Sequence, residues 1–188
     1  MIERILVSLV VLLSVAQPYG ATSADQRDDQ ESVHYVGTFS NMEFTEEHAY
    51  GSQLELWKCE NEFIGLFMYS EGLAGDTPTG LLENVQYNPQ AKGLTFDAKL
   101  TTGVRYRGPG KEEPTHDLFV FSGKLKDNSV EGVLKRFDKL ENTHQPLIEK
   151  VVLKKMSEGD LAETFKIKTL HDWRSYSQMI LKHRGPKW

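Results

Sequence analysis

Short segments in which apolar and polar residues alternate follow one another along most of the chain. This period of two is typical of β-strands with one buried face. The clearest segment is 94–100 (LTFDAKL), in which every second residue is apolar. The pattern predicts eight strands, at residues 33–43, 52–60, 62–70, 80–88, 93–101, 117–125, 129–137 and 147–156.

The connections between the predicted strands are alternately long and short. Short turns with hairpin-forming residues fall at 59–62, 88–92 and 126–129, and longer loops fall at 45–51, 71–79, 103–116 and 138–146. In an up-and-down antiparallel sheet, successive turns lie at opposite ends. We therefore expect an all-β fold, an eight-stranded antiparallel up-and-down barrel or curved sheet, whose long-loop end carries any binding site.

One predicted strand, around 63–69 (FIGLFMY), is apolar on both faces, so its outer face needs a cover. The C-terminal segment offers one, because its apolar residues recur at helical spacing. These residues are Leu170, Trp173, Tyr176, Ile180 and Leu181. Thr169 and Asp172 resemble a capping box. We expect a helix at about 170–183 that packs on the outside of the sheet, with a dimer contact on the same strip as the alternative.

The N-terminus has the three-part pattern of a secretory signal. Arg4 precedes an apolar run at 5–16, and small residues follow up to Ala24. The run is shorter than the about 20 residues that span a bilayer. We expect residues 1–24 to be a cleaved signal peptide and 25–32 to be a disordered polar start. The protein would then be periplasmic or extracellular, with no stable membrane anchor after cleavage.

The remaining chain is long enough for one domain with a real core, the barrel at 33–156, followed by a C-terminal extension at 157–188. The net charge of −5 gives no electrostatic reason to bind nucleic acid. Cys59 is the single cysteine, so no intrachain disulfide can form. It is either a reactive thiol or a buried small hydrophobic residue.

The first predicted strand contains Gly37-Thr-Phe39, which is similar to the Gly-x-Trp opening of lipocalins, with Phe in place of Trp. Eight antiparallel strands and a C-terminal helix also resemble the lipocalin or wider calycin plan. Segments 37–41 (GTFSN) and 65–72 (GLFMYSEG) more closely resemble motifs that recur in a family of small secreted bacterial β-barrel proteins. The resemblance implies carriage of a small apolar molecule or inhibition of a partner protein.

Three histidines, His48, His116 and His144, fall in three of the four predicted long loops, and acidic residues adjoin the first two. If the loops converge, histidines and carboxylates could form a metal site. Their spacing has no metal-binding signature, so solvated side chains are the alternative.

Arg105, Tyr106 and Arg107 lie in the longest predicted loop. Two guanidinium groups beside an aromatic ring can hold a carboxylate, a phosphate or a sugar. The alternative is a solvated loop in which Glu112 and Glu113 balance the charge.

Strand alternation places two charged residues, Glu83 and Arg136, on inward faces. Inward charges are costly unless they are paired or reach water, so they could anchor a ligand. A β-bulge would instead move either residue outside. The inward faces are also rich in phenylalanine, which either lines an apolar pocket or fills the core.

The sequence contains no nucleophile elbow and no phosphate-binding loop, and it suggests no cofactor. We expect a non-enzymatic protein that binds a small apolar or amphipathic ligand at the long-loop end. The expected ligand-binding residues are Tyr50, Phe67, Phe96, Arg105, Tyr106, Arg107 and Phe121. The alternatives are a structural or protein-interaction module of the cell envelope with a solid core, contacting its partner through the Met68 side of the third strand, and an enzyme or metal protein that uses the three histidines.

Overall fold

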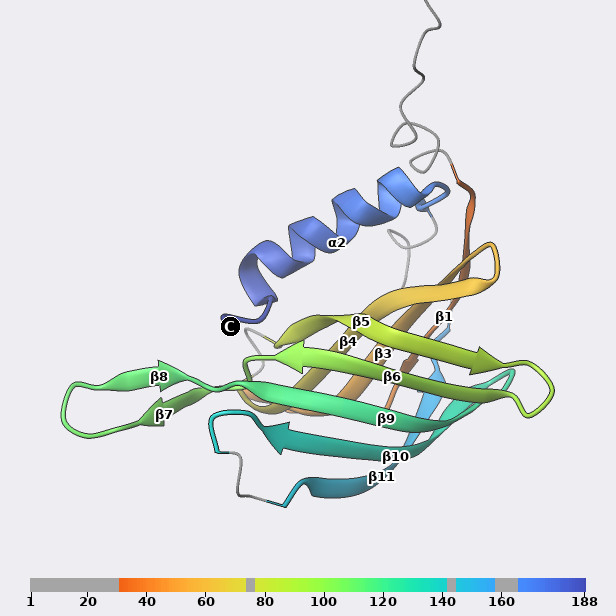
Figure 1. Cartoon of the computed structure of the whole chain (residues 1–188). Helices are drawn as coiled ribbons and strands as arrows, with labels where there is room; N and C mark the ends of the chain where they lie inside the picture. The colour runs from red at the N-terminus through yellow and green to blue at the C-terminus, as the bar shows by residue number, and fades with distance from the viewer. Residues whose placement is uncertain (1–30, 74–76, 142–144, 158–165) are drawn as a thin grey trace, which may run out of the picture.

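The structure, a computed structural model, describes residues 31–73, 77–141, 145–157 and 166–188 (Figure 1). The expected signal peptide at 1–24 and most of the polar segment after it lie outside these residues. The described part contains the strands β1 (Val33–Ser40), β2 (Glu43–Phe44), β3 (His48–Cys59), β4 (Glu62–Leu73), β5 (Thr79–Asn88), β6 (Gly93–Leu100), β7 (Val104–Tyr106), β8 (Glu112–Pro114), β9 (Asp117–Leu125), β10 (Ser129–Asp138) and β11 (Leu147–Lys155), and the helix α2 (Leu170–Arg184).

Eight of these strands form a closed antiparallel up-and-down barrel, as predicted. The strand order is β1-β11-β10-β9-β6-β5-β4-β3, and β1 also pairs with β3 to close the circle. The short hairpins β3–β4, β5–β6 and β9–β10 lie at one end, which we call the short-turn end (Figure 1). The other connections lie at the opposite, long-loop end.

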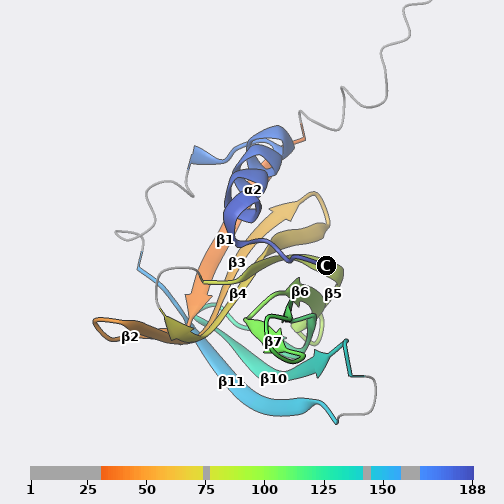
Figure 2. The same ribbon diagram turned by 90° about the vertical axis from the view of Figure 1, so that its left-hand side faces the viewer.

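Two predicted loops contain more strand than expected. The expected loop at 45–51 is largely strand, because β3 begins at His48 and pairs with β4 as far as Leu73. The predicted first strand ends early at Ser40, and the chain then turns into β2, which pairs with the start of β3. The longest loop carries the hairpin β7–β8, which projects from the long-loop end (Figures 1 and 2).

The barrel has two weak seams. β1 pairs with β11 only at Phe39–Lys155 and Ser40–Lys154, and β4 pairs with β5 at three positions, whereas β3 and β4 share twelve pairs. The wall therefore consists of two well-paired sheets, β1-β3-β4 and β5-β6-β9-β10-β11, which meet along short ladders (Figure 2).

Aromatic side chains fill the barrel interior. The fully buried rings inside the barrel are those of Phe39, Phe67, Phe96, Phe119 and Phe121, each at most 1% exposed. The Phe67 and Phe96 ring centroids lie 5.6 Å apart, and those of Phe96 and Phe121 lie 5.0 Å apart. These rings are almost completely buried from water, so they pack as a dense core around the barrel axis.

The helix α2 covers the outside of the sheet β1-β3-β4, as the apolar outer face of β4 predicts (Figure 1). This second apolar cluster consists of Val33, Trp57, Cys59 and Ile167, with Tyr35, Ile64, Leu170, Trp173 and Tyr176 packed against it. Thr169 and Asp172 form the expected capping box. Met68 is 7% exposed, so its side of β4 is covered within the chain. No helix in the described ranges is long and apolar enough to cross a membrane.

Candidate functional site

An ion-pair network centred on Arg136 lies at the long-loop end of the barrel. Arg136 donates from Nε to Asp117 Oδ1 (3.0 Å) and from Nη1 to Glu71 Oε1 (2.7 Å). Its Nη2 donates to Thr102 Oγ1 (2.6 Å). These partners come from β9, β4 and the segment after β6, so one guanidinium ties together three parts of the barrel wall.

Aromatic rings line the inner side of this guanidinium. Its carbon lies 5.6 Å from the Tyr69 ring centroid and 5.7 Å from that of Phe119, within the range of cation–π attraction. Arg136 therefore points inward, as strand alternation predicts. Burial raises the pKa of Tyr69 to about 12, and the nearby Glu71 carboxylate adds to this shift.

Asp117 is the buried carboxylate of this network, at 3% exposure. Burial alone would raise its pKa, but the hydrogen bonds from Thr115 and Thr102 and the charge of Arg136 together hold that pKa below its usual value. The carboxylate is thus ionised at neutral pH. The hydrogen-bonded network around it covers the phenylalanine core at the long-loop end.

Glu83, the other charge expected to point inward, lies outside. Asn84 has a φ of 52°, and the β5–β6 register shifts between Glu83 and Gln86. This bulge puts Leu82 on the inner face together with Val85. Glu83 instead forms an ion pair with Lys99 on the outer face, with Oε2 2.8 Å from Nζ.

The seven residues expected to bind a ligand lie in three separate environments. Phe67, Phe96 and Phe121 are core side chains. Tyr50 is on β3, 48% exposed, and its ring stacks on His48 with the centroids 6.0 Å apart.

The other three are on or next to the β7–β8 hairpin. Arg105 donates to both Asp138 and Glu141. Arg107 donates from Nε to Glu113 (2.9 Å), so one of the two acidic residues expected to balance the charge of this loop pairs with it. Tyr106 is 72% exposed, with its ring away from the barrel interior.

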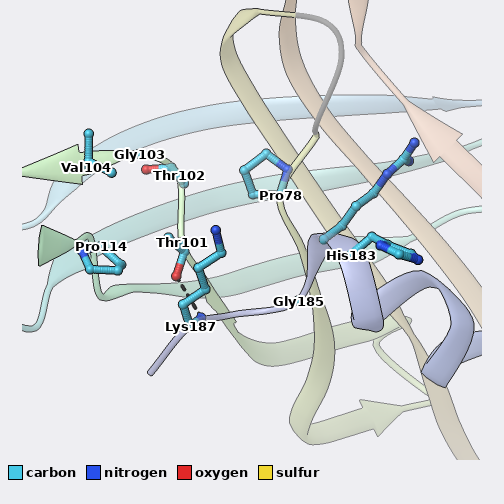
Figure 3. Close-up of a pocket in the computed structure, with 10 residues that line it drawn as sticks. Pro78, Thr101, Thr102, Gly103, Val104, Pro114, His183, Gly185 and Lys187 are labelled. Atoms are coloured by element: carbon cyan, nitrogen blue, oxygen red, sulfur yellow. Dashed lines mark hydrogen bonds between the residues drawn. The ribbon is translucent and has the colours of Figure 1, made fainter. Parts of the chain in front are cut away.

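A recess of about 230 Å³ lies at the long-loop end, between the C-terminus of α2 and the segment that joins β6 to β7 (Figure 3). Its lining residues are Pro78, Thr101, Thr102, Gly103, Val104, Pro114, His183, Arg184, Gly185 and Lys187. Lys187 donates from its backbone N to Thr101 Oγ1 (2.9 Å), and Trp188 donates from Nε1 to Leu100 O (2.9 Å). These bonds hold the C-terminal segment against the barrel.

Among the described residues that line this recess, Arg184 and Lys187 are cationic and none is acidic. Sequence reasoning assigned His183 and Arg184 only to the end of the helix. The sequence feature that could have pointed to the recess is that basic residues continue beyond the end of the helix to Lys187.

Two of the three candidate metal-binding histidines make ring contacts instead of approaching each other. His48 stacks on Tyr50, and His116 stacks on Trp188 with the centroids 5.0 Å apart. His144 lies outside the described residues. Within the described ranges, no three His, Cys, Asp or Glu side chains are grouped in a way that could hold a metal ion.

Cys59 has the properties of a structural residue. It is 7% exposed, and its Sγ lies 3.3 Å from Glu31 Oε2. Burial raises the pKa of this thiol to about 11, and the Glu31 carboxylate adds to the effect. The thiol is protonated at neutral pH and is therefore a poor nucleophile.

Comparison of the chain with protein-family models, curated proteins and solved structures finds no match. The geometry of this chain alone must therefore support any functional assignment.

Proposed function

We propose that this protein is an exported, non-enzymatic binding protein that takes a small amphipathic anion at its long-loop end. The observation that carries the proposal is the recess between α2 and the β6–β7 segment, where Arg184 and Lys187 are cationic and none of the described lining residues is acidic (Figure 3). Export rests on the signal-like pattern of residues 1–24.

The recess offers groups for both parts of an amphipathic anion. Arg184 and Lys187 would attract a carboxylate or sulfonate. Pro78, Val104 and Pro114 would contact an apolar group, and Val104 is 51% exposed. The C-terminus of α2 carries a partial negative charge, so the basic side chains and not the helix must supply the attraction.

The dense core supports a ligand at the barrel mouth over one inside the barrel. An internal ligand would have to displace rings such as Phe96 and Phe121, which are each 1% exposed. The recess volume of about 230 Å³ is slightly below the roughly 300 Å³ at which typical ligand pockets begin. The ligand is therefore small. An eight-stranded barrel is compatible with a lipocalin-like fold, for which Gly37-Thr-Phe39 is the local resemblance.

The compact aromatic anion 2-naphthalenesulfonate is a suitable probe. In an NMR titration, we expect it to shift the backbone amides of residues 101–104, 185, 187 and 188, which line or adjoin the recess. Replacing Lys187 with Glu reverses a charge at the site and should weaken binding about tenfold, equivalent to about 1.4 kcal/mol. Lys135→Glu makes the same charge change on the exposed face of β10 and serves as the matched control. Equal affinities for both variants would refute the proposed site.

A second candidate function is a protein-interaction module with a solid core. The edge of β11 favours it, because only Lys154 and Lys155 of this strand pair with β1. Leu147, Ile148 and Val152 are 68%, 65% and 51% exposed. An unpaired edge with apolar side chains is a template for strand addition, and a second copy of this chain is the simplest partner.

If this edge pairs with a second copy, the protein should form a dimer whose population rises with concentration in sedimentation-velocity experiments. The double variant Ile148→Lys and Val152→Lys should stay monomeric, because added charge on an edge opposes strand addition. Val133→Lys on the neighbouring strand β10 controls for the added charge. If the wild-type protein stays monomeric over the whole concentration range, the β11 edge does not pair with a second copy.

A further inference from the structure

A second recess, of about 340 Å³, lies at the short-turn end, opposite the site discussed above. Its lining residues are Val36, Phe39, Tyr87, Lys92, Leu125, Lys126, Asp127 and Lys155. The apolar members belong to the barrel core or pack directly against it. The recess therefore has an apolar floor that is continuous with the core and a rim that carries three lysines.

The weak seams of the barrel explain why an apolar floor is accessible at this end. Residues 33–38 of β1, which lie toward the short-turn end, precede the two pairs of this strand with β11, Phe39–Lys155 and Ser40–Lys154. β4 and β5 pair only between Leu66–Met68 and Thr79–Leu81, so the rest of β5 runs away from β4. The two sheets thus separate toward the short-turn end, where side-chain contacts such as that of Phe63 with Tyr87 (4.9 Å between ring centroids) replace backbone pairing.

The rim has more positive than negative charge. Lys126 pairs with Glu131, which lies outside the recess lining. Lys92 is 3.4 Å from Asp127, but their side chains are 55% and 91% exposed, and such exposed pairs are weak. Lys155 forms no ion pair within the described ranges, and its Nζ lies 6.0 Å from the Phe39 ring centroid. A positive rim on a chain with a net charge of −5 would concentrate anions locally.

Gly37 makes room for Lys155. A Cβ atom at this position would lie 2.8 Å from Lys155 Cε, which is closer than real Cβ contacts allow. The missing side chain lets the lysine stem cross β1 and place its ammonium group over Phe39. The Gly37-Thr-Phe39 segment, noticed in the sequence as a strand opening, thus shapes one wall of this recess.

We propose that the short-turn end binds a single-chain anionic amphiphile, with its head group among Lys92, Lys126 and Lys155. Its apolar chain lies against Val36 and Tyr87, which are half-buried, above the buried side chains of Phe39 and Leu125. An ammonium group is a compact point charge, so it can bind a carboxylate or a phosphate head group equally well. The recess volume is within the range of roughly 300–1,000 Å³ for ligand sites. This site is independent of the proposed long-loop function and uses none of its residues.

Isothermal titration of the full chain with sodium dodecanoate, below its micelle concentration, tests the proposal. We expect saturable binding of one molecule per chain. Lys155→Met keeps the length of the stem but removes the charge, and should weaken binding about tenfold. Lys150→Met on the exposed face of β11 is the matched control. Lys187→Met should leave dodecanoate binding unchanged, which separates this site from the long-loop site.

Flotation with vesicles distinguishes a free amphiphile from a membrane lipid as the source of the anionic head. Flotation with phosphatidylglycerol vesicles but not with phosphatidylcholine vesicles, lost in Lys155→Met, would assign the site to a lipid head group. Dodecanoate binding without flotation would assign it to a free carboxylate. The proposal is overturned if the wild-type protein binds neither probe, or if Lys155→Met binds both as tightly as the wild type. Circular dichroism melting checks that each variant is folded.

Discussion

Replacing Arg136 with Ala is expected to lower the free energy of unfolding by about 3–5 kcal/mol, the range for breaking a buried ion pair. The guanidinium satisfies Asp117, Glu71 and Thr102 at once. Without it, Asp117 keeps a charge in a site where its side chain is only 4% exposed. Urea denaturation followed by tryptophan fluorescence measures the loss.

Matched variants separate the ion pair from the packing of the arginine stem. Arg107→Ala removes a guanidinium whose side chain is 45% exposed and paired with Glu113, and should cost less than about 1 kcal/mol. The double variant Arg136→Met and Asp117→Leu removes both charges and should recover much of the lost stability. A loss below about 1 kcal/mol for Arg136→Ala would mean that water already solvates this network.

Acid unfolding offers an independent check on the same carboxylate. The pKa of Asp117 is held below its usual value in the folded state, so this group contributes stability above the unfolded-state pKa of about 3.9. That contribution is lost as the pH falls through the lower, folded-state pKa. In Arg136→Met, one cause of the lowered pKa is absent, so the drop in stability on acidification should be smaller than in the wild type.

Local alternation was sufficient to predict most of the barrel. The strand predicted at 117–125 coincides with β9, and the helix predicted at about 170–183 is α2. Both predictions depend on side-chain periodicity, which a sequence displays directly. The bulge at Asn84 shows the limit of this reasoning, because one additional residue reverses every later side chain of a strand and leaves no compositional signal.

The candidate sites were less predictable because each gathers residues that are distant in sequence. The long-loop recess joins Thr101 to Lys187, and the short-turn recess joins Lys92 to Lys155. Alternation shows which face of a strand is buried, but it does not show which turns meet across a barrel end. The inward position of Arg136 was predictable from its own strand, whereas its partner Glu71, on a distant strand, was not.

Trp57 is the center of the contact between helix α2 and the barrel. Its side chain is fully buried, and its ring lies 5.6 Å from that of Tyr35 and 5.8 Å from that of Tyr176. Tyr176 in turn donates a hydrogen bond to Glu55 Oε2 (2.9 Å), a carboxylate whose pKa is raised by burial beneath the helix. The indole therefore supports both the apolar and the polar parts of this layer.

Trp57→Ala is expected to lower the free energy of unfolding by about 3–5 kcal/mol, since it leaves a large cavity under the helix. Trp57→Phe should cost much less than Trp57→Ala. The Trp57 Nε1 atom has no hydrogen-bond partner within the described ranges, and removing a buried unsatisfied donor offsets part of the packing loss. Thermal unfolding by circular dichroism measures both variants, with Tyr50→Phe on the exposed part of β3 as a control. Equal destabilisation by Trp57→Phe and Trp57→Ala would contradict this expectation. The indole nitrogen would then have to make a polar contact. Hydrogen bonding at Trp57, as well as the packing of its ring, would hold the layer under α2.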